Sequence, residues 1–369
     1  MRRAAQRATR SSLSAGADAP LPSLRDITVI APHFKRRLSG VTSTVVQLVP
    51  EQVRLGRGIV TLGPGLPDSL PKMRWAQLPE LWKRPAGTHF RVWHARRNSE
   101  MLPGILMRSV LRMPLKLLFT SAAQRNHSRY TKWLIRQMDA VVATSARSGS
   151  FLEVPHTVIR HGIDLDVFHP PRSEDDTIAA TGLPGRFLIG CFGRVRHQKG
   201  TDLFVRAMIE LLPQHPDWTA VVCGRVTVEH QAFGDDLKRA VAEAGLSDRI
   251  RFLGEVDDIK PWYRRLTLYV APSRNEGFGL TPLEAMASQT AVVSSDAGAY
   301  AEQIVVAETG AVVPAGNYDA LRHAIEPYLA DPGLAEEHGR NGLEHVRGNF
   351  ALRGEAQALE RVYSAMISL

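Results

Sequence analysis

The feature that most constrains the fold of this chain is a regular alternation in its second half between short apolar runs and amphipathic segments. The apolar runs are continuous and rich in Val, Ile, Leu and Ala. Such runs are typical of parallel strands covered on both faces by helices. The predicted strands are Phe187–Phe192, Thr219–Cys223, Arg249–Leu253, Leu268–Ala271, Ala291–Ser294 and Ala311–Val313.

The first half shows the same alternation less regularly. Asp26–Pro32 is a short run rich in β-branched residues, and similar runs lie within Arg57–Gly65, His89–Ala95 and Met138–Ala146. With 369 residues the chain is too long for one ordinary core. The alternation therefore predicts an α/β protein with two Rossmann-like domains, each a doubly wound parallel sheet.

A polar, proline-rich segment at Thr157–Pro171 separates the two halves and predicts the domain boundary. The first residues are rich in Arg, Ala and Ser and lack the apolar core of a signal peptide. The last segment contains Leu352–Ile367, whose apolar spacing predicts a helix. The expected divisions are a disordered basic tail over 1–24, a first domain over 25–165, a second domain over 166–350 and a final helix over 351–369.

The positive charge of the chain is concentrated in one region. The net charge is +9, and the window 72–132 holds 13 Lys and Arg against two acids, Glu80 and Glu100. Such a patch implies an anionic partner. Within Met101–Phe119 three cations recur every four residues, as on one face of a helix: Arg108, Arg112 and Lys116. This pattern suits docking on an anionic membrane surface. The alternative is an ordinary core helix with a charged side, bent or broken at Pro114.

The two cysteines and the lack of long apolar runs indicate in which cellular compartment the protein is expected. Cys191 and Cys223 lie in apolar runs and are expected to be buried and reduced, as in a cytoplasmic protein. No run of 18 apolar residues occurs in the sequence, so no membrane-spanning helix is expected. Together with the basic patch, these features predict a cytoplasmic protein that associates with the inner face of the cytoplasmic membrane.

Two glutamates flank a glycine turn in the stretch EGFGLTPLEAMA, which starts at Glu276. Glu276 directly follows a predicted strand, at the carboxyl end where parallel sheets bind ligands. Gly277 and Gly279 let the backbone approach a ligand closely, and the N-terminus of the following helix suits a pyrophosphate. A carboxylate is poor at binding phosphate but accepts hydrogen bonds from hydroxyls. Glu276 is therefore predicted to bind a sugar.

Glu284 has a structural interpretation as well as a functional one. Thr281, Pro282 and Glu284 match an N-cap, a proline at the first helical position and a glutamate at the third, which is a capping box. A ligand contact remains the alternative for this carboxylate.

The second motif is GRVRHQKG, from Gly193 to Gly200, between a predicted strand and a predicted helix. Arg194 offers a planar fork and Lys199 a point charge, and both suit phosphate oxygens. The alternative is a solvated basic loop. The motif lacks the Gly-Lys-Ser/Thr ending of a Walker loop, and no G-x-G-x-x-G follows a predicted strand.

The two motifs, in this order and about 80 residues apart, together resemble the retaining nucleotide-sugar glycosyltransferases of family 4, which adopt the GT-B fold of two Rossmann-like domains facing a cleft. The stretch RHGIDLDVFHP resembles their interdomain hinge, and the final helix would cross back to the first domain. The resemblance extends from Asp26 onward.

The resemblance implies roles for matching residues. Arg194 and Lys199 would bind the donor diphosphate, Glu276 the sugar hydroxyls and Glu284 the ribose hydroxyls. The loop after the first strand would approach the phosphate through Gly40, where the family usually has two glycines. The backbone contacts to sugar and phosphate would come from Gly277, Phe278, Gly279 and Leu280.

The region around His94, FRVWHARRNSEM, is similar to the lipopolysaccharide core mannosyltransferases within that family. Family members often carry an active-site histidine here, so His94 is a candidate catalytic residue beside Glu276, Lys199 and Arg194; a structural histidine is the alternative. Arg96 and Arg97 could bind an anionic acceptor. This narrower resemblance implies transfer of mannose from GDP-mannose to a lipid-linked or lipopolysaccharide core acceptor.

The resemblance to a transferase leaves other functions open. No Asp-x-Asp motif appears that would hold a divalent metal, so neither a divalent metal nor another cofactor is expected. A UDP-sugar donor, a sugar-nucleotide epimerase and a catalytically silent binding subunit are alternatives. A nucleic-acid-binding protein would explain the basic patch, but the patch lacks a recognition motif, and no nucleic-acid partner is expected.

Overall fold

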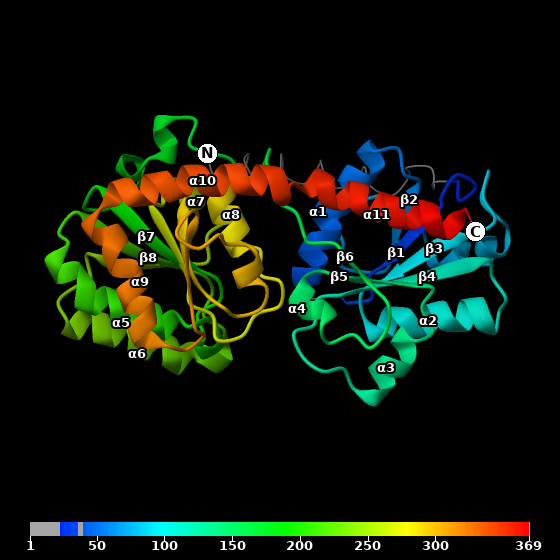
Figure 1. The fold of residues 1–369 in the computed structure, drawn as a ribbon, viewed down its shortest axis with the longest axis horizontal. Coiled ribbons are helices and arrows are strands. Elements are labelled where there is room, and N and C mark those ends of the chain that lie inside the picture. Colours follow the sequence, from blue (N-terminus) through cyan, green and yellow to red (C-terminus); the bar gives the residue numbers. More distant parts are fainter. Residues whose placement is uncertain (1–22, 36–39, 369) are drawn as a thin grey trace, which may run out of the picture. The chain divides into compact units, whose positions relative to one another are not determined.

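The computed structural model describes residues 23–35 and 40–368, and these residues form two parallel six-stranded sheets with helices (Figure 1). The predicted class of two doubly wound α/β sheets is confirmed. One compact unit combines the described residues of 1–120, 128–141 and 356–369, and the other combines 121–127 with 142–355. Since both units draw on separated segments, the expected boundary between residues 165 and 166 stays a prediction.

The beginning of the chain is described only in part. Residues 1–22 of the expected tail lie outside the described residues. Leu24 is buried, and its carbonyl accepts a hydrogen bond of 2.7 Å from Arg91 Nη2. The folded part of the chain therefore includes the last residues that were assigned to the tail.

The first sheet has the strand order β2–β1–β3–β4–β5–β6. Because β1 lies between β2 and β3, the direction of winding reverses beside β1, and the loops after β1 and β3 meet at a switch point, where such sheets bind ligands. The strands are β1 (Val29–Pro32), β2 (Ile59–Leu62), β3 (Arg91–Ala95), β4 (Leu115–Ser121), β5 (Ala140–Ala143) and β6 (Thr157–Val158).

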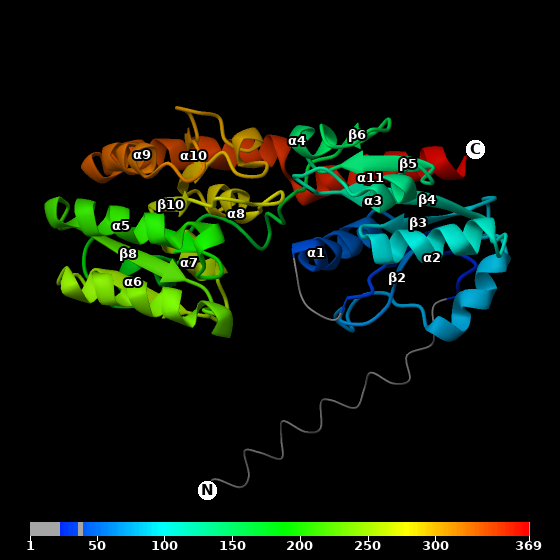
Figure 2. The same cartoon turned by 90° about the horizontal axis from the view of Figure 1, so that it is seen from below.

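Neighbouring side chains of β3 show how helices cover the two faces of this sheet. Trp93 packs against α2, where a Cβ on Gly104 would lie 2.7 Å from the indole ring. The next residue, His94, points to the opposite face and contacts Tyr363 of α11. Figure 2 shows α2 and α11 with the sheet between them. The helices built around this sheet are α1 (Gly40–Arg54), α2 (Asn98–Ser109), α3 (Arg129–Ile135), α4 (Ala146–Gly149) and α11 (Leu352–Ile367).

The second sheet has the order β12–β11–β10–β7–β8–β9. Its switch point lies between β7 and β10, the two central strands. Each predicted strand of this half is present, with ends within one residue of the prediction. They are β7 (Phe187–Phe192), β8 (Trp218–Cys223), β9 (Ile250–Gly254), β10 (Leu268–Ala271), β11 (Ala291–Ser295) and β12 (Gly310–Val313).

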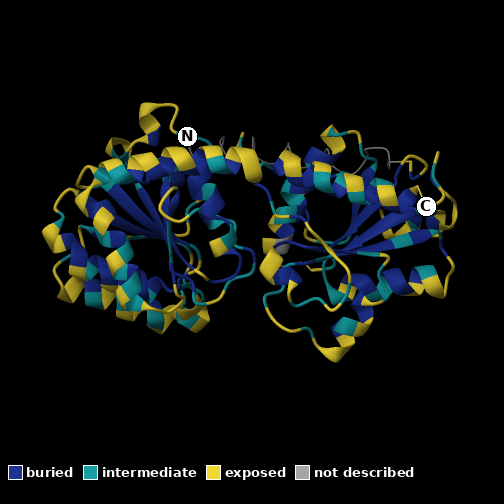
Figure 3. Cartoon of the chain, viewed as in Figure 1, coloured by how far each residue is buried: buried dark blue, intermediate teal, exposed yellow. Residues whose placement is uncertain are grey.

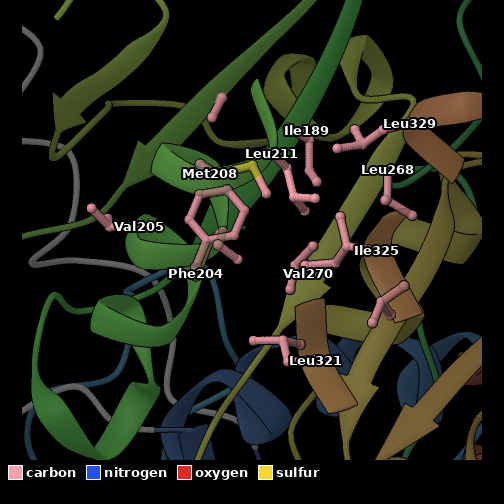
Figure 4. Packing of buried hydrophobic residues seen from close by; sticks show 14 of the residues in the cluster. Ile189, Phe204, Val205, Met208, Leu211, Leu268, Val270, Leu321, Ile325 and Leu329 are labelled. Atoms are coloured by element: carbon pink, nitrogen blue, oxygen red, sulfur yellow. The ribbon is translucent and has the colours of Figure 1, made fainter. Parts of the chain in front are cut away.

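Helices cover both faces of the second sheet, so its four inner strands, β7, β8, β10 and β11, are almost wholly buried, whereas the edge strand β9 is partly exposed (Figure 3). Apolar side chains of β7, β10 and β11 pack on one face against Phe204 and Met208 of α5 and Ile325 of α9 (Figure 4). The opposite face packs against α7, α8 and α10. The helices are α5 (Thr201–Leu211), α6 (Gln231–Glu243), α7 (Lys260–Arg265), α8 (Thr281–Ala287), α9 (Tyr318–Ala330) and α10 (Pro332–Asn349).

The expected single helix over Met101–Phe119 is wrong. Helix α2 ends at Ser109, the chain turns at Arg112 with a φ of 53°, and residues from Leu115 form β4. Pro114 cannot continue a helix, and its carbonyl instead accepts a hydrogen bond of 3.1 Å from the Arg91 N–H of β3. The three cations predicted for one helical face therefore lie on a helix, a turn and a strand.

Both cysteines are buried and free, as predicted. Burial raises the pKa of the Cys191 thiol to about 12 and that of Cys223 to about 11. Both thiols are therefore protonated and unreactive at neutral pH. Among the described residues, no helix is long and apolar enough to cross a membrane.

Candidate active site

The two sequence motifs meet at the switch point of the second sheet. Residues 193–200 follow β7 and residues 272–280 follow β10, and the two strands pair in parallel. Arg274 Nη1 and Nη2 donate to the two carboxylate oxygens of Asp202, each at 2.7 Å. The Arg274 N–H also donates to the Gln198 carbonyl at 2.8 Å. The bidentate ion pair and the backbone bond hold the two loops together as one surface.

Gly200 shows how closely the loops approach. Its φ is +69°, and a Cβ at this position would overlap the carbonyl oxygen of Pro272. Only glycine combines this backbone conformation with the absence of a side chain. The last glycine of GRVRHQKG therefore brings the β7 loop into contact with the β10 loop.

Lys199 and Glu276 form an ion pair between the two motifs. Their side chains are 21% and 18% exposed, so the pair is partly shielded from water. Glu276 Oε2 accepts from Lys199 Nζ and, at 3.4 Å, from the Tyr300 hydroxyl, while Oε1 accepts from the Gly277 N–H at 3.0 Å. Oε1 therefore keeps the larger capacity for a further hydroxyl, and the ammonium keeps protons for an anion.

The EGFG turn is held by residues that come later in the chain. Gly279 has a φ of +74°, and a Cβ there would overlap the Tyr300 ring. Gln303 is fully buried and donates from Nε2 to the carbonyls of Phe278, at 3.0 Å, and Gly279, at 2.9 Å. The Phe278 ring is buried and packs edge-on against His161, with centroids 5.0 Å apart.

Glu284 does not form the predicted capping box. Leu280 is the N-cap of α8, Thr281 is already helical, and the helix start has no side-chain cap. Glu284 Oε2 instead accepts a hydrogen bond of 2.7 Å from the Tyr263 hydroxyl. Burial raises the pKa of Glu284, although this hydrogen bond acts in the opposite direction. The carboxylate is thus fixed by a side chain and does not close the helix end.

The remaining predicted donor residues differ in setting. Arg194 is exposed at the start of its loop. Gly277 and Leu280 are half-buried beside Glu276 and the start of α8. Gly40 is exposed at the first residue of α1, and residues 36–39 before it lie outside the described residues. Gly40 belongs to the first unit, and the other predicted donor residues belong to the second.

His94 is enclosed in the first unit, with 1% of its surface exposed. Nδ1 lies 2.7 Å from the Tyr363 hydroxyl and Nε2 lies 2.7 Å from Thr120 Oγ1. Burial, with the nearby charge of Arg96, lowers its pKa well below the usual value. Both ring nitrogens are hydrogen-bonded within the unit, which favours a structural histidine; a catalytic role stays a prediction.

The two predicted acceptor arginines also differ. Arg97 pairs with the buried Glu100 at 3.0 Å and donates to His33 Nδ1 at 2.9 Å. Arg96 contacts His94 through longer approaches, 3.3 Å to its carbonyl and 3.5 Å to Nδ1. The contact between Arg97 and His33 was not predicted, because a single histidine after a strand does not indicate its partner in the sequence. Arg96 is therefore better placed than Arg97 to bind an added anion.

Part of the basic patch is neutralised within the fold. Asp139 pairs with Arg108 at 2.8 Å and lies 3.9 Å from Lys116. Arg91 is 1% exposed and donates to backbone carbonyls. In contrast, the side chain of Arg112 is exposed. Fewer cations of this region thus face solvent than the sequence suggested.

Several residues of the site carry no sequence signal. They are polar side chains in helices and loops, and their partners lie far along the chain: Tyr263, Arg274, Tyr300 and Gln303. Within the described ranges, no three His, Cys, Asp or Glu side chains are grouped as ligands for a metal ion.

The family model and two curated relatives that match this chain are all glycosyltransferases. Residues 173–345 match the family model of glycosyl transferases group 1. The chain is 72% identical to the lipopolysaccharide core biosynthesis mannosyltransferase LpcC of Rhizobium leguminosarum bv. viciae, covering 94% of this chain and 99% of that protein. It is 54% identical to the lipopolysaccharide core biosynthesis mannosyltransferase LpsB of Rhizobium meliloti (strain 1021), covering 93% and 99%.

Solved structures agree on the fold. The C-terminal domain of the group 1 glycosyltransferase LpcC from Francisella tularensis is 38% identical, with a TM-score of 0.50, over 52% of this chain and 99% of that domain. Anabaena Alr3699/HepE, solved with UDP and glucose, has a TM-score of 0.77 at 18% identity, covering 92% of this chain and all of that one. At that identity the second likeness concerns the fold alone.

Proposed function

Because the chain belongs to the group 1 glycosyltransferases, we propose that this enzyme moves a mannosyl residue from GDP-mannose to a hydroxyl of a lipopolysaccharide core saccharide. The similarity to LpcC and LpsB over nearly the whole chain carries this choice of sugar and acceptor. The ion pair at the switch point of the second sheet supplies the chemistry.

In the proposed reaction the bond between the sugar and the diphosphate breaks, and the acceptor hydroxyl bonds to the anomeric carbon with retention. The transition state has oxocarbenium character, and negative charge grows on the leaving diphosphate. Lys199 and Arg194 would neutralise that charge, so the reaction would need no divalent metal. Glu276 would accept from the sugar hydroxyls through Oε1, its less occupied oxygen.

The nucleoside part of the donor would bind beyond the β10 loop, beside the first turn of α8. Glu284 would accept from the ribose hydroxyls with Oε1, because Tyr263 already occupies Oε2. The Tyr263 hydroxyl thus fixes the carboxylate in one orientation. Gly277, Phe278, Gly279 and Leu280 would add backbone contacts to sugar and phosphate.

The first test is thermal stability with GDP, UDP and ADP. A ligand present at 100 times its dissociation constant adds roughly 2.7 kcal/mol. We expect GDP alone to stabilise the protein, and GDP-mannose to lose mannose only when an acceptor is present. Stabilisation by UDP would keep the transferase and discard mannose. Donor turnover without acceptor would favour an epimerase, and no shift with any nucleotide would refute the donor site.

For the acceptor we propose an anionic, lipid-linked saccharide. Arg96 is the residue that supports this, since Arg97 is committed to Glu100 and His33. Arg96→Ala should raise the acceptor KM while leaving the donor KM unchanged. An equal effect on both would place Arg96 outside acceptor binding.

A lipid-linked acceptor also suggests where the enzyme works, and we extend the proposal to docking on an anionic membrane at the inner face of the cytoplasmic membrane. An apolar tip in the first unit supports it. Trp82 ends the 3₁₀ turn η1 (Trp75–Trp82), and its indole N–H donates to the Leu111 carbonyl at 2.7 Å. The tip consists of four exposed side chains: Trp82, Leu106, Val110 and Leu111.

Exposed cations lie next to this apolar tip in the sequence: Lys83 and Arg84 follow Trp82, and Arg112 follows Leu111. Aromatic and aliphatic side chains enter the interfacial layer of a bilayer, and each nearby cation adds about 1 kcal/mol on an anionic surface. The helical face expected from the sequence is thus replaced by a tip formed by the end of α2, the turn that follows it and the end of η1.

Vesicle sedimentation tests the docking. We expect binding to vesicles containing phosphatidylglycerol and little binding to phosphatidylcholine. Val110→Asp should weaken it, because Val110 is 68% exposed on the tip. Val228→Asp is the matched control, since Val228 is 94% exposed in the other unit. Equal sedimentation of both variants would refute the tip, and a salt-dependent shift of duplex DNA would favour the nucleic-acid alternative.

A further inference from the structure

The turn after β11 packs against the EGFG loop and holds it in place. The residues of this turn belong to neither of the two sequence motifs. This turn contains η7 (Tyr300–Glu302) and Gln303. Tyr300 is 1% exposed and Gln303 is fully buried. Buried polar side chains carry a desolvation cost, which their hydrogen bonds must offset. The partners of these two side chains are therefore informative.

Gln303 determines the orientation of two peptide groups. Its Nε2 donates to the carbonyls of Phe278 and Gly279. In a planar trans peptide the N–H points opposite to the C=O. The N–H groups of Gly279 and Leu280 consequently point away from Gln303. Among the described residues, no hydrogen bond uses either of these two N–H groups.

The backbone here has the shape of a donor cup. Gly279 is left-handed, with a φ of +74°, and Leu280 is right-handed, with φ −86° and ψ −18°. Successive residues of opposite handedness turn their N–H groups toward a common concave side, which suits anionic or strongly polar oxygens. Gln303 thus fixes the direction of the Gly279 and Leu280 N–H groups, which form no hydrogen bond among the described residues.

Tyr300 acts on the carboxylate of the same loop. Its hydroxyl lies 3.4 Å from Glu276 Oε2 and 3.4 Å from Thr281 Oγ1, and its ring lies against Gly279. Burial raises the pKa of Tyr300 above its usual value, so the hydroxyl keeps its proton and donates to the carboxylate. Together with Lys199 it occupies Oε2 and leaves Oε1 for a ligand.

We propose that Tyr300 and Gln303 are positioning residues for the donor sugar: Tyr300 fixes the carboxylate of Glu276, and Gln303 fixes the Gly279 and Leu280 N–H groups. The inference rests on the proposed function, because it assigns these residues to the sugar side of the donor site. Neither residue touches the reacting atoms. Their substitution should therefore change how the sugar is held more than how the nucleoside diphosphate binds.

The first experiment uses Tyr300→Phe, which removes one hydroxyl from the carboxylate. We expect GDP to bind within twofold of wild type and kcat with GDP-mannose to fall about tenfold, the scale of one hydrogen bond to a charged group. Tyr328→Phe is the matched control. It removes an equally buried hydroxyl, hydrogen-bonded to His338 at 2.9 Å, within the same unit. A wild-type kcat in Tyr300→Phe, or an equal loss in both variants, would overturn the role of Tyr300.

The second experiment uses Gln303→Glu, which provides a pH signature. An ionised carboxylate would face two carbonyl oxygens and repel them, whereas the protonated acid can donate to one. The kcat of the variant relative to wild type should therefore rise as the pH falls from 8 to 6. A purely structural role would lower stability without this dependence. A flat ratio, or a wild-type kcat at pH 8, would overturn the role of Gln303.

Different results would refute the proposed GDP-mannose donor and the positioning role of Tyr300 and Gln303. If wild type binds UDP and a UDP-sugar instead of GDP and GDP-mannose, the proposed donor is wrong, and the same comparisons are made with the UDP pair. If Gln303→Glu does not fold, Tyr300→Phe decides the inference, because it retains the ring that packs against Gly279.

Discussion

The replacement of Lys199 by alanine tests the chemistry of the site most directly. Lys199 is only 21% exposed, and its ammonium contacts the carboxylate that is proposed to hold the sugar. Its loss removes the charge that is proposed to face the leaving diphosphate. Loss of one preorganised electrostatic contact costs about 100- to 1,000-fold in turnover, or about 2.7–4 kcal/mol. We therefore expect kcat to fall at least about a hundredfold.

The fold itself should tolerate this change. A partly exposed ion pair contributes on the order of 1 kcal/mol or less, and Glu276 keeps its bonds from Tyr300 and the Gly277 N–H. The melting temperature should thus stay within about 3 °C of wild type. Lys238→Ala, at an exposed position on α6, is the control for loss of a surface charge in the same unit.

The assay is mannose transfer at saturating GDP-mannose, with Glu276→Ala and the double variant alongside. Glu276→Ala should also lose at least about a hundredfold. Because the two side chains touch, their effects should not add, and the discrepancy should be about 0.5–3 kcal/mol. Near-normal turnover in either single variant would refute the role assigned to that residue. Strict additivity would show that the ion pair has no part in the reaction.

Two further predictions concern backbone strain and pH. Gly279→Ala should lower the free energy of unfolding by at least about 1–2 kcal/mol, because its φ is +74° and the new Cβ overlaps the Tyr300 ring; urea denaturation beside Gly277→Ala, where a Cβ has room, checks this. Burial and the charge of Arg97 lower the pKa of His33 from 6.5 to about 4 in the folded protein. As the pH falls below 6.5, this histidine is therefore protonated in the unfolded chain before it is protonated in the folded one. The free energy of unfolding should consequently be about 2 kcal/mol lower at pH 5 than at neutral pH. His33→Gln, which keeps an acceptor but does not titrate, should lose less, and parallel pH curves would contradict the assignment.

Much of the second unit could be predicted because its strands are covered on both faces. A strand buried in this way must be apolar at every position, and the runs at β7 and β10 match the structure residue for residue. The same rule explains the error at Met101–Phe119. There an apolar helix runs through a short turn into an apolar strand, and the sequence shows one continuous stretch.

The site was predictable only in its two motifs. Lys199 and Glu276 each follow a predicted strand, but their contact depends on β7 and β10 being neighbours, which the order of strands along the chain does not reveal. Tyr300 and Gln303 are single polar residues in a turn, and their hydrogen-bond partners lie in a loop more than 20 residues earlier. Glu284 matched a capping pattern, yet Tyr263 binds its carboxylate.

The ion pair between Arg274 and Asp202 has an evolutionary consequence. It joins the first turn of α5, directly after the loop that carries Lys199, to the loop that carries Glu276. A substitution in either loop is therefore expected to disturb the position of the other, and the two motifs are expected to change together. Recombination that exchanged this half of the chain as a whole would keep the ion pair, whereas exchange of one loop alone would separate Arg274 from the Asp202 it pairs with.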